Sequence, residues 1–168
     1  MNHPAVRQRL PRSLPLFVIL VGVAALAAAS FAQYVGGLAP CPLCLWQRYP
    51  YGVAIVLGVV ALLLTDRPAI GRAVLALAGL AILASAGIAV FHVGVERHWW
   101  AGLASCSGAI DLTQPADQLA KQLMEAPVVR CDQVAWSLFG LSIASYNVLY
   151  AGATGLATLW AASRRWSP

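Results

Sequence analysis

Long apolar runs separated by polar segments dominate the chain. A membrane-spanning helix needs about 20 mainly apolar residues, and four runs have this character, at about 14–33, 45–64, 73–95 and 136–162. Helices are expected because an open strand cannot satisfy its backbone polar groups in lipid. Small residues are frequent in all four runs and permit close helix approach. The pattern predicts one all-α membrane domain over residues 1–168, a four-transmembrane-helix bundle.

The composition argues against an ordinary soluble domain. Of the 168 residues, 60% are hydrophobic and only 10% are charged, whereas soluble domains carry about a quarter charged residues. The net charge of +5 would suit nucleic acid only if Lys and Arg gathered on one face. Here the basic residues flank the apolar runs instead. We therefore expect a lipid bilayer, and no nucleic acid, among the partners.

The first apolar run has a second interpretation, as a cleaved signal peptide. Arg7, Arg9 and Arg12 would form its basic region, and residues 30–32 resemble a cleavage site. The apolar regions of signal peptides usually span about 7–15 residues, and this run is longer. A retained helix is the favoured interpretation.

The charges beside the runs predict the orientation of the chain. Seven basic residues and one acidic residue lie before the first run, between the second and third, and after the fourth. The other two connecting segments hold four basic residues and five acidic ones. By the positive-inside rule, both termini are expected in the cytoplasm. The loops at about 34–48 and 96–135 then face the outside, where disulfides persist.

All four cysteines lie in these two outward loops. Cys41 and Cys44 form a compact Cys-Pro-Leu-Cys motif, whereas 24 residues separate Cys106 from Cys131. Pro42 suits the first turn of a helix, so Cys44 is expected near a helix N-terminus, where the dipole favours a thiolate. The small residues around Cys106 should leave its sulfur accessible to another protein.

Structural roles compete with redox chemistry for these cysteines. Taken alone, Cys106 and Cys131 suit a structural disulfide, but the dithiol motif on the same side favours an electron relay. A zinc site accepts four thiolates, yet the second pair lacks the usual short spacing and we expect no histidine to substitute. Covalent haem needs a histidine after the motif, where Leu45 stands. We predict four catalytic cysteines and no metal site.

Three further features have candidate roles. Arg48 follows Cys44 by four residues and shares its face if the helix continues. Its side chain could snorkel to headgroups, or steady a thiolate or a reduced acceptor in the bilayer, and proximity to Cys44 favours the second role.

His92, near the outer end of the third run, is expected to meet water or a neighbouring carbonyl. Residues 114–126 predict a short amphipathic helix on the bilayer surface.

These motifs resemble the disulfide bond formation protein B family, the inner-membrane thiol:quinone oxidoreductases of bacteria. The likeness is carried by Pro-Cys-Pro-Leu-Cys-Leu-Trp-Gln-Arg at 40–48, by Cys106, by Cys131-Asp132, and by 136–142 followed by Tyr146-Asn147. It extends over nearly the whole chain in order and topology.

The resemblance implies a membrane thiol oxidase of the bacterial inner membrane. A periplasmic thioredoxin-like dithiol oxidase would attack the Cys106–Cys131 disulfide at Cys106. Electrons would then pass by exchange between Cys131 and Cys41 to the Cys41–Cys44 pair. Cys44 would finally meet a membrane quinone, ubiquinone or menaquinone, with Arg48 as the quinone-binding residue.

Two alternatives and several questions stay open at this point. A vitamin K epoxide reductase-like protein also has two cysteine pairs, but its Cys-x-x-Cys motif follows the loop pair, and here it comes first. A non-enzymatic membrane scaffold with structural disulfides is the alternative from a different class. The residues do not determine the quinone, the partner or the oligomeric state, and four cysteines allow three disulfide pairings.

Overall fold

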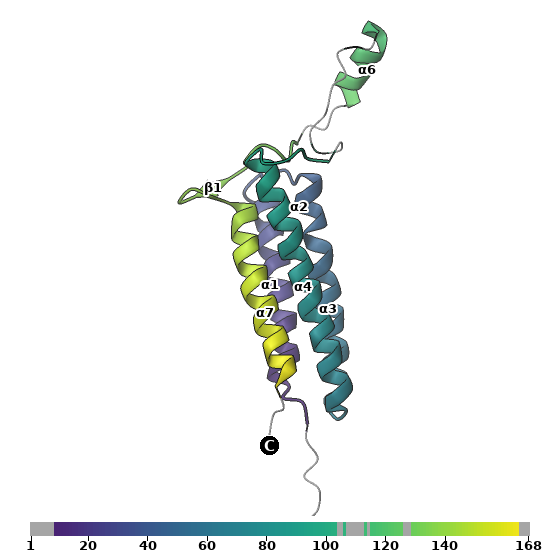
Figure 1. The fold of residues 1–168 in the computed structure, drawn as a ribbon, viewed down its shortest axis with the longest axis vertical. Helices are drawn as coiled ribbons and strands as arrows, with labels where there is room; N and C mark the ends of the chain where they lie inside the picture. The colour runs from purple at the N-terminus through teal and green to yellow at the C-terminus, as the bar shows by residue number, and fades with distance from the viewer. Residues whose placement is uncertain (1–8, 104–105, 107–112, 114, 126–128, 165–168) are drawn as a thin grey trace, which may run out of the picture.

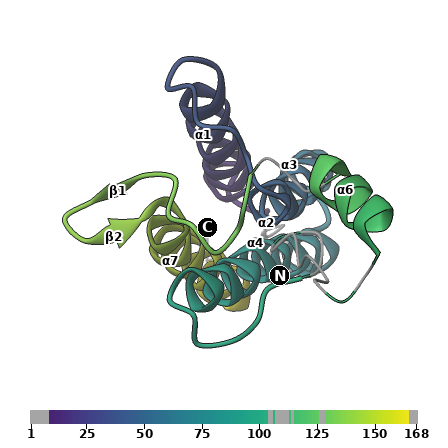
Figure 2. The same ribbon diagram turned by 90° about the horizontal axis from the view of Figure 1, so that it is seen from above.

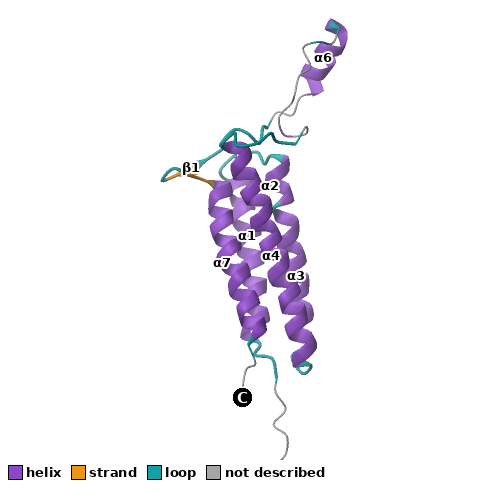
Figure 3. Ribbon diagram, viewed as in Figure 1, coloured by secondary structure: helices purple, strands orange, loops and turns teal. Residues whose placement is uncertain are grey.

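A computed structural model describes residues 9–103, 106, 113, 115–125 and 129–164. These residues are mostly helical, and the strands within them form a single short hairpin (Figure 3). Two arginines used to predict the orientation, Arg7 and Arg165, lie outside the described residues.

The long helices lie side by side and carry the shorter elements at one end (Figure 1). The helices, in chain order, are α1 (Ser13–Tyr34), α2 (Pro42–Trp46), α3 (Arg48–Leu63), α4 (Pro68–Glu96), α6 (Ala116–Glu125) and α7 (Ile143–Ser163). The hairpin strands are β1 (Ser137–Leu138) and β2 (Leu141–Ser142). The antiparallel hairpin, α2 and the start of α7 are at the same end, so the connections bearing the cysteines are gathered there.

Three of the four predicted spans are long and apolar enough to cross a membrane, by length and composition. They are Ser13–Tyr34, Pro42–Leu63 and Pro68–Glu96. The second of these consists of α2 and α3 together. Within the described residues α7 does not join this group, because polar side chains interrupt its apolar sequence. The chain is therefore a mostly helical protein with three candidate membrane-spanning helices.

The second predicted helix begins earlier than expected and contains a break. The prediction was a start near residue 45, but α2 already begins at Pro42, and Gln47 forms a turn between α2 and α3. Pro50 explains the break, since it has no N–H to donate to the carbonyl of Trp46 one turn earlier. Because the turn is a single residue, the chain still rises as one span.

The fourth predicted helix starts later than expected. The prediction placed its start near residue 136, but the β1–β2 hairpin occupies this stretch and α7 begins only at Ile143. Phe139 and Gly140 form the turn with positive φ angles of 50° and 76°, the backbone that two-residue hairpins require. Ser142 then caps α7, accepting a hydrogen bond from the backbone N–H of Ser145 at 3.2 Å.

Helix α4 is the centre of the packing, with α7 and α3 as its main neighbours, while α1 packs chiefly on α3. Gly79 of α4 meets Gly155 of α7, and a Cβ added to either would lie 3.2 Å from the carbonyl oxygen of the other. The two glycines thus let the backbones of α4 and α7 approach each other closely.

Trp100 folds back over the outer end of α4. Its indole N–H donates to the carbonyl of Phe91 at 3.0 Å, and the two rings stack with centroids 5.9 Å apart. A Cβ on Gly94 would overlap the Trp100 ring. Phe91 also packs against the buried cysteines. Gly94 therefore allows Trp100 to pack over the end of α4 that lies next to the cysteines.

Replacing Gly94 with alanine is expected to lower the free energy of unfolding by about 2 kcal/mol, because the methyl group displaces Trp100. Unfolding of the detergent-purified protein measures the change. Gly87 of the same helix is the matched control, since its added Cβ meets nothing within 4 Å. Gly87→Ala should be neutral or stabilising by up to about 1 kcal/mol. Equal stability of the two variants would contradict the role assigned to Gly94.

Candidate redox site at one end of the helices

Both cysteine pairs belong to one buried cluster. Cys41, Cys106 and Cys131 are buried within it, and Cys44 is half-buried at its edge. Apolar residues complete the cluster: Leu43, Ile88, Phe91, Val95, Leu103 and Val129. Two pairs that are 62 residues or more apart in sequence are therefore packed together, as exchange between them requires.

Cys41 and Cys44 are free thiols with adjacent sulfur atoms. Pro42 starts α2, and Cys41 is its N-cap, so the Cys41 sulfur accepts a hydrogen bond from the backbone N–H of Cys44 at 3.2 Å. The Cys41 thiol in turn donates to the Cys44 sulfur at 2.8 Å. This hydrogen bond, with burial, raises the pKa of Cys41. The Cys44 sulfur is thus the hydrogen-bond acceptor of the pair. Cys44 lies in the first turn of α2, as the sequence predicted.

Cys106 and Cys131 form a disulfide. The backbone N–H of Cys131 also donates to the carbonyl of Cys106 at 3.0 Å. The expectation of an accessible Cys106 sulfur is wrong, since both half-cystines are completely buried. Its small neighbours at 104–105 and 107–108 lie outside the described residues.

An ion pair brackets the Cys131 end of this disulfide. The Arg130 guanidinium donates to both carboxylate oxygens of Asp132, at 2.9 and 2.6 Å. These hydrogen bonds hold the pKa of Asp132 below its ordinary value. The bidentate pair thus links the two residues on either side of Cys131.

His92 is part of the site. Water or a neighbouring carbonyl was the expected partner. Water is excluded because only 2% of the residue is exposed, whereas the backbone hydrogen bond with Cys131 agrees with the second expectation. Its Nε2 lies 3.6 Å from the Cys41 sulfur and its Nδ1 lies 3.0 Å from the Gln47 amide nitrogen. The ring also interacts with the backbone of Cys131. His92 therefore touches both cysteine pairs.

A chain of hydrogen bonds leads from His92 across the helices to α7. The Gln47 side-chain oxygen accepts from the Asn147 amide at 2.7 Å, and Asn147 also donates to Ser85 at 3.1 Å. The Tyr51 hydroxyl donates to the Asn147 oxygen at 2.6 Å. Polar residues in otherwise apolar helices pair with one another in this way.

His92 and the dithiol together resemble a set of metal ligands. The ligand atoms of Cys41, Cys44 and His92 lie within 4.8 Å of one another, so a histidine does approach the dithiol, contrary to the expectation. However, Gln47 faces Nδ1 with an N–H, which leaves the ring proton on Nε2. Nε2 is the nitrogen that faces Cys41 and therefore has no lone pair for a metal in this arrangement.

Arg48 bonds to α1. It donates to the side-chain oxygen of Gln33 at 2.7 Å and approaches the carbonyl of Ala29 at 3.5 Å. Its third nitrogen, Nε, is buried and has no hydrogen-bond partner within the described part of the chain. The Arg48 side chain therefore points to α1 and not to lipid headgroups. Its Nε–H remains available to donate a hydrogen bond to a ligand.

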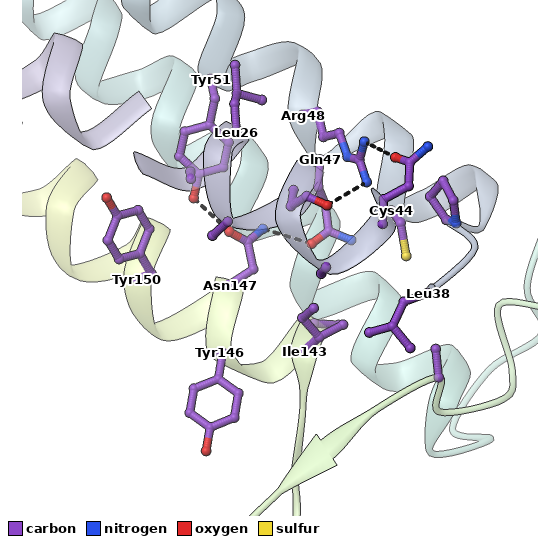
Figure 4. Close-up of a pocket in the computed structure, with 18 of the residues that line it drawn as sticks. Leu26, Leu38, Cys44, Gln47, Arg48, Tyr51, Ile143, Tyr146, Asn147 and Tyr150 are labelled. Atoms are coloured by element: carbon purple, nitrogen blue, oxygen red, sulfur yellow. Dashed lines mark hydrogen bonds between the residues drawn. The ribbon is translucent and has the colours of Figure 1, made fainter. Parts of the chain in front are cut away.

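A pocket of about 510 Å³ lies beside Cys44 and Arg48. It is set between α1 and α7, which stand apart when the helices are viewed from above (Figure 2). Figure 4 shows Cys44, Gln47 and Arg48 in its wall, with Asn147 of α7 hydrogen-bonded to Gln47 and Tyr150 further along α7. Small residues of α1 form much of the wall: Ala24, Ala25, Ala28, Ala29 and Ala32. The volume and the apolar wall suit a flat organic ligand.

The family model described as disulfide bond formation protein DsbB matches residues 11–161. The chain belongs to the DsbB family. It is 30% identical to disulfide bond formation protein B of Stutzerimonas stutzeri over 92% of this chain and 96% of that one. For disulfide bond formation protein B of Azoarcus sp., the identity is 30% over 90% and 93%. An uncharacterized protein of Rickettsia prowazekii, RP370, is 32% identical over 81% and 78%. No solved structure matches the chain significantly.

Membership in the DsbB family confirms the resemblance recognised in the motifs, and identifies a membrane disulfide bond formation protein with redox chemistry. Because the family model matches residues 11–161, the vitamin K epoxide reductase-like alternative is set aside.

The hydrogen-bond network that links His92 to α7 was not predicted from the sequence. Gln47 and Asn147 had been noted only as parts of motifs, and Glu96 only as a loop charge. Glu96 is in fact buried and accepts a hydrogen bond from Ser142, the N-cap of α7. The signal that could have revealed them is an amide within an apolar run, or a carboxylate directly at the end of one, because either group is costly in a membrane without a partner.

Proposed function

We propose that this DsbB-family protein is a protein-dithiol:quinone oxidoreductase of the bacterial inner membrane. It would reoxidise a periplasmic thioredoxin-like dithiol oxidase and pass the electrons to a quinone, which sustains protein disulfide formation. The observation that carries this proposal is the single buried cluster of both cysteine pairs, with Cys44 at its edge and also in the wall of the pocket.

The electrons would travel in four thiol–disulfide exchanges. A thiolate of the partner attacks Cys106, which forms a mixed disulfide and releases Cys131 as a thiolate. Cys131 then attacks Cys41 of an oxidised Cys41–Cys44 pair, which releases Cys44 as a thiolate. The partner's second thiolate then attacks the mixed disulfide, which forms the partner's own disulfide and releases Cys106 as a thiolate. Cys106 finally attacks Cys131 and releases Cys41. Each exchange forms one S–S bond and breaks one. The burial of Cys106 means that the loop must open when the partner binds.

The pocket fits a quinone in size and chemistry. Arg48 Nε, buried and without a hydrogen-bond partner, can donate to a quinone carbonyl oxygen. The alanines of α1 leave room for a flat ring and for an apolar tail that leaves between the helices. When bound, a quinone supplies an acceptor for two electrons and two protons. The residues that would hold it are Arg48, Cys44 and the wall contributed by α7.

We also propose that α7 crosses the membrane, giving four spans with both termini in the cytoplasm and the cysteine loops in the periplasm. Its polar side chains have partners inside the protein, which removes the cost of placing them in lipid. Asn147 bonds to Gln47, while Thr154 and Thr158 donate to carbonyls one turn earlier, at 2.6 and 2.8 Å. Cysteine accessibility mapping in spheroplasts tests the orientation.

Quinone reduction by the purified protein is the direct test. A reduced thioredoxin-like dithiol protein is mixed with the enzyme in detergent, and loss of the quinone absorbance is followed with ubiquinone and with menaquinone analogues in turn. The control is the same dithiol protein after alkylation. Turnover that depends on the free dithiol supports the proposal. No consumption of either quinone would favour a membrane scaffold whose disulfides are only structural.

Arg48→Gln is expected to raise the KM for quinone roughly tenfold or more, because a hydrogen bond to a cationic donor is lost. The KM for the dithiol partner should change little, since the partner meets the other cysteine pair. Arg97→Gln is the matched control, because Arg97 is exposed and donates a hydrogen bond to the Gly140 carbonyl, at 3.4 Å, away from the pocket. Unchanged quinone kinetics in Arg48→Gln would leave Arg48 with the structural task of tying α3 to α1.

A further inference from the structure

Gln47 determines which nitrogen of His92 carries the proton. The Gln47 amide nitrogen donates to the carbonyl of Leu43 at 3.1 Å, and a carbonyl can only accept. The amide oxygen accepts from Asn147. Both contacts orient the amide the same way, so the N–H that remains points at His92 Nδ1, 3.0 Å away. Nδ1 is therefore the acceptor, and the neutral ring carries its proton on Nε2.

The groups around Nε2 agree with this tautomer. The Cys41 sulfur lies 3.6 Å away, within hydrogen-bond range for an atom as large as sulfur. The nearer carboxylate oxygen of Glu96 is 3.8 Å away, beyond hydrogen-bond length for oxygen. The backbone of Cys131 also faces the ring. With the proton on Nδ1, the Cys41 sulfur would lose the hydrogen bond from the ring.

Two donors thus converge on the Cys41 sulfur, the His92 Nε2–H and the backbone N–H of Cys44. Cys41 is only 3% exposed. A thiolate formed there receives little help from water, and a buried charge is costly unless it accepts hydrogen bonds. The two donors would therefore offset part of the cost of a negative charge on the Cys41 sulfur when the thiolate forms there.

We propose that His92 is the hydrogen-bond donor that stabilises the Cys41 thiolate as it leaves a disulfide with Cys131, and that Gln47 is the positioning residue that keeps the donor on Nε2. This inference rests on the proposed function, in which Cys41 and Cys131 are joined during exchange. In the step concerned, the Cys106 thiolate attacks Cys131. The Cys106–Cys131 bond forms, the Cys131–Cys41 bond breaks, and Cys41 takes the electron pair. No proton is exchanged with solvent.

Nuclear magnetic resonance of the Cys44→Ala protein tests the geometry without partner or quinone. In that background Cys41 is the free thiol, and its labelled Cβ reports deprotonation through its chemical shift. We expect His92→Leu to raise the pKa of Cys41 by about one pH unit. Gln47→Met should raise it less, because the ring then samples both tautomers. The control Gln118→Met, on the exposed part of α6, should leave it unchanged.

Nitrogen-15 shifts of the histidine rings provide a measurement that needs no substitution at the site. A neutral ring with its proton on Nε2 is the expected signature of His92. A proton on Nδ1, or superimposable Cys41 titrations in Cys44→Ala with and without His92→Leu, would overturn the proposal. Both readouts are independent of turnover, so such a failure leaves the proposed function standing.

Kinetics of the protein with all four cysteines separate this role from direct action on the quinone. His92→Leu should lower kcat roughly tenfold while the KM for quinone stays constant. A raised KM at constant kcat would mean that His92 acts on the quinone, and would also overturn the proposal. If the wild-type protein reduces no quinone at all while the titrations shift as expected, it is the proposed function that fails.

Discussion

Cys44→Ser is expected to lower quinone reduction by about a thousandfold or more, the largest catalytic effect of any substitution considered. A serine hydroxyl does not ionise at neutral pH and cannot form a disulfide with Cys41, so no thiolate can be released beside the pocket. The pocket and the buried cluster should survive, because the change replaces one atom of a half-buried side chain. Steady-state loss of quinone absorbance measures the effect.

The same variant should still react with the partner, which supplies its internal control. The Cys106–Cys131 disulfide does not depend on Cys44. A mixed disulfide between the partner and Cys106 should therefore still form and be visible on a non-reducing gel. Wild-type turnover in Cys44→Ser would refute the relay. Loss of the mixed disulfide together with turnover would instead indicate a misfolded variant.

Gly155→Leu is expected to cost about 3 kcal/mol or more in the free energy of unfolding, the largest effect on stability. An added Cβ would lie 2.8 Å from the Leu83 side chain and 3.2 Å from the Gly79 carbonyl oxygen. Leu83 could move, but the backbone of α4 could give way only if the two helices separated. Overpacking commonly costs about 1–3 kcal/mol, and a whole leucine adds three more carbons than a single Cβ.

Gly152→Leu is the matched control, one helical turn earlier in α7. A Cβ there meets nothing within 4 Å, so the leucine can point away from the neighbouring helices and should be tolerated. Unfolding of both variants in the same detergent, followed by circular dichroism, provides the comparison. Similar stabilities would show that α4 and α7 do not depend on their close approach at Gly79 and Gly155.

The three candidate membrane-spanning helices were predictable because length and apolarity are local properties. The boundaries were less so. The start of α7 was placed too early because the apolar residues of 136–142 resemble a helix, whereas the positive φ angles at Phe139 and Gly140 turn them into a hairpin. A local pattern of apolarity does not distinguish these two outcomes when the segment is short.

The positions of the cysteines along the chain were also predictable, but their burial was not. The sequence alone identified four cysteines in two loops, with Cys44 in the first turn of a helix, since Pro42 and the spacing of the motif are local signals. The accessibility of Cys106 was predicted incorrectly. Its neighbours in sequence are small, but the residues that bury it, such as Val95 of α4, come from elsewhere in the chain.

By itself, then, the sequence determined the class of protein, the helices long and apolar enough for a membrane, the dithiol motif and the family. The tertiary structure decided which polar groups meet the sulfur atoms. His92 is 51 residues from Cys41 and Asn147 is 100 residues from Gln47, so no spacing in the sequence relates them. They meet because small residues let α4 pack closely against α7, and because a buried amide or imidazole in an apolar interior is stable only beside a partner.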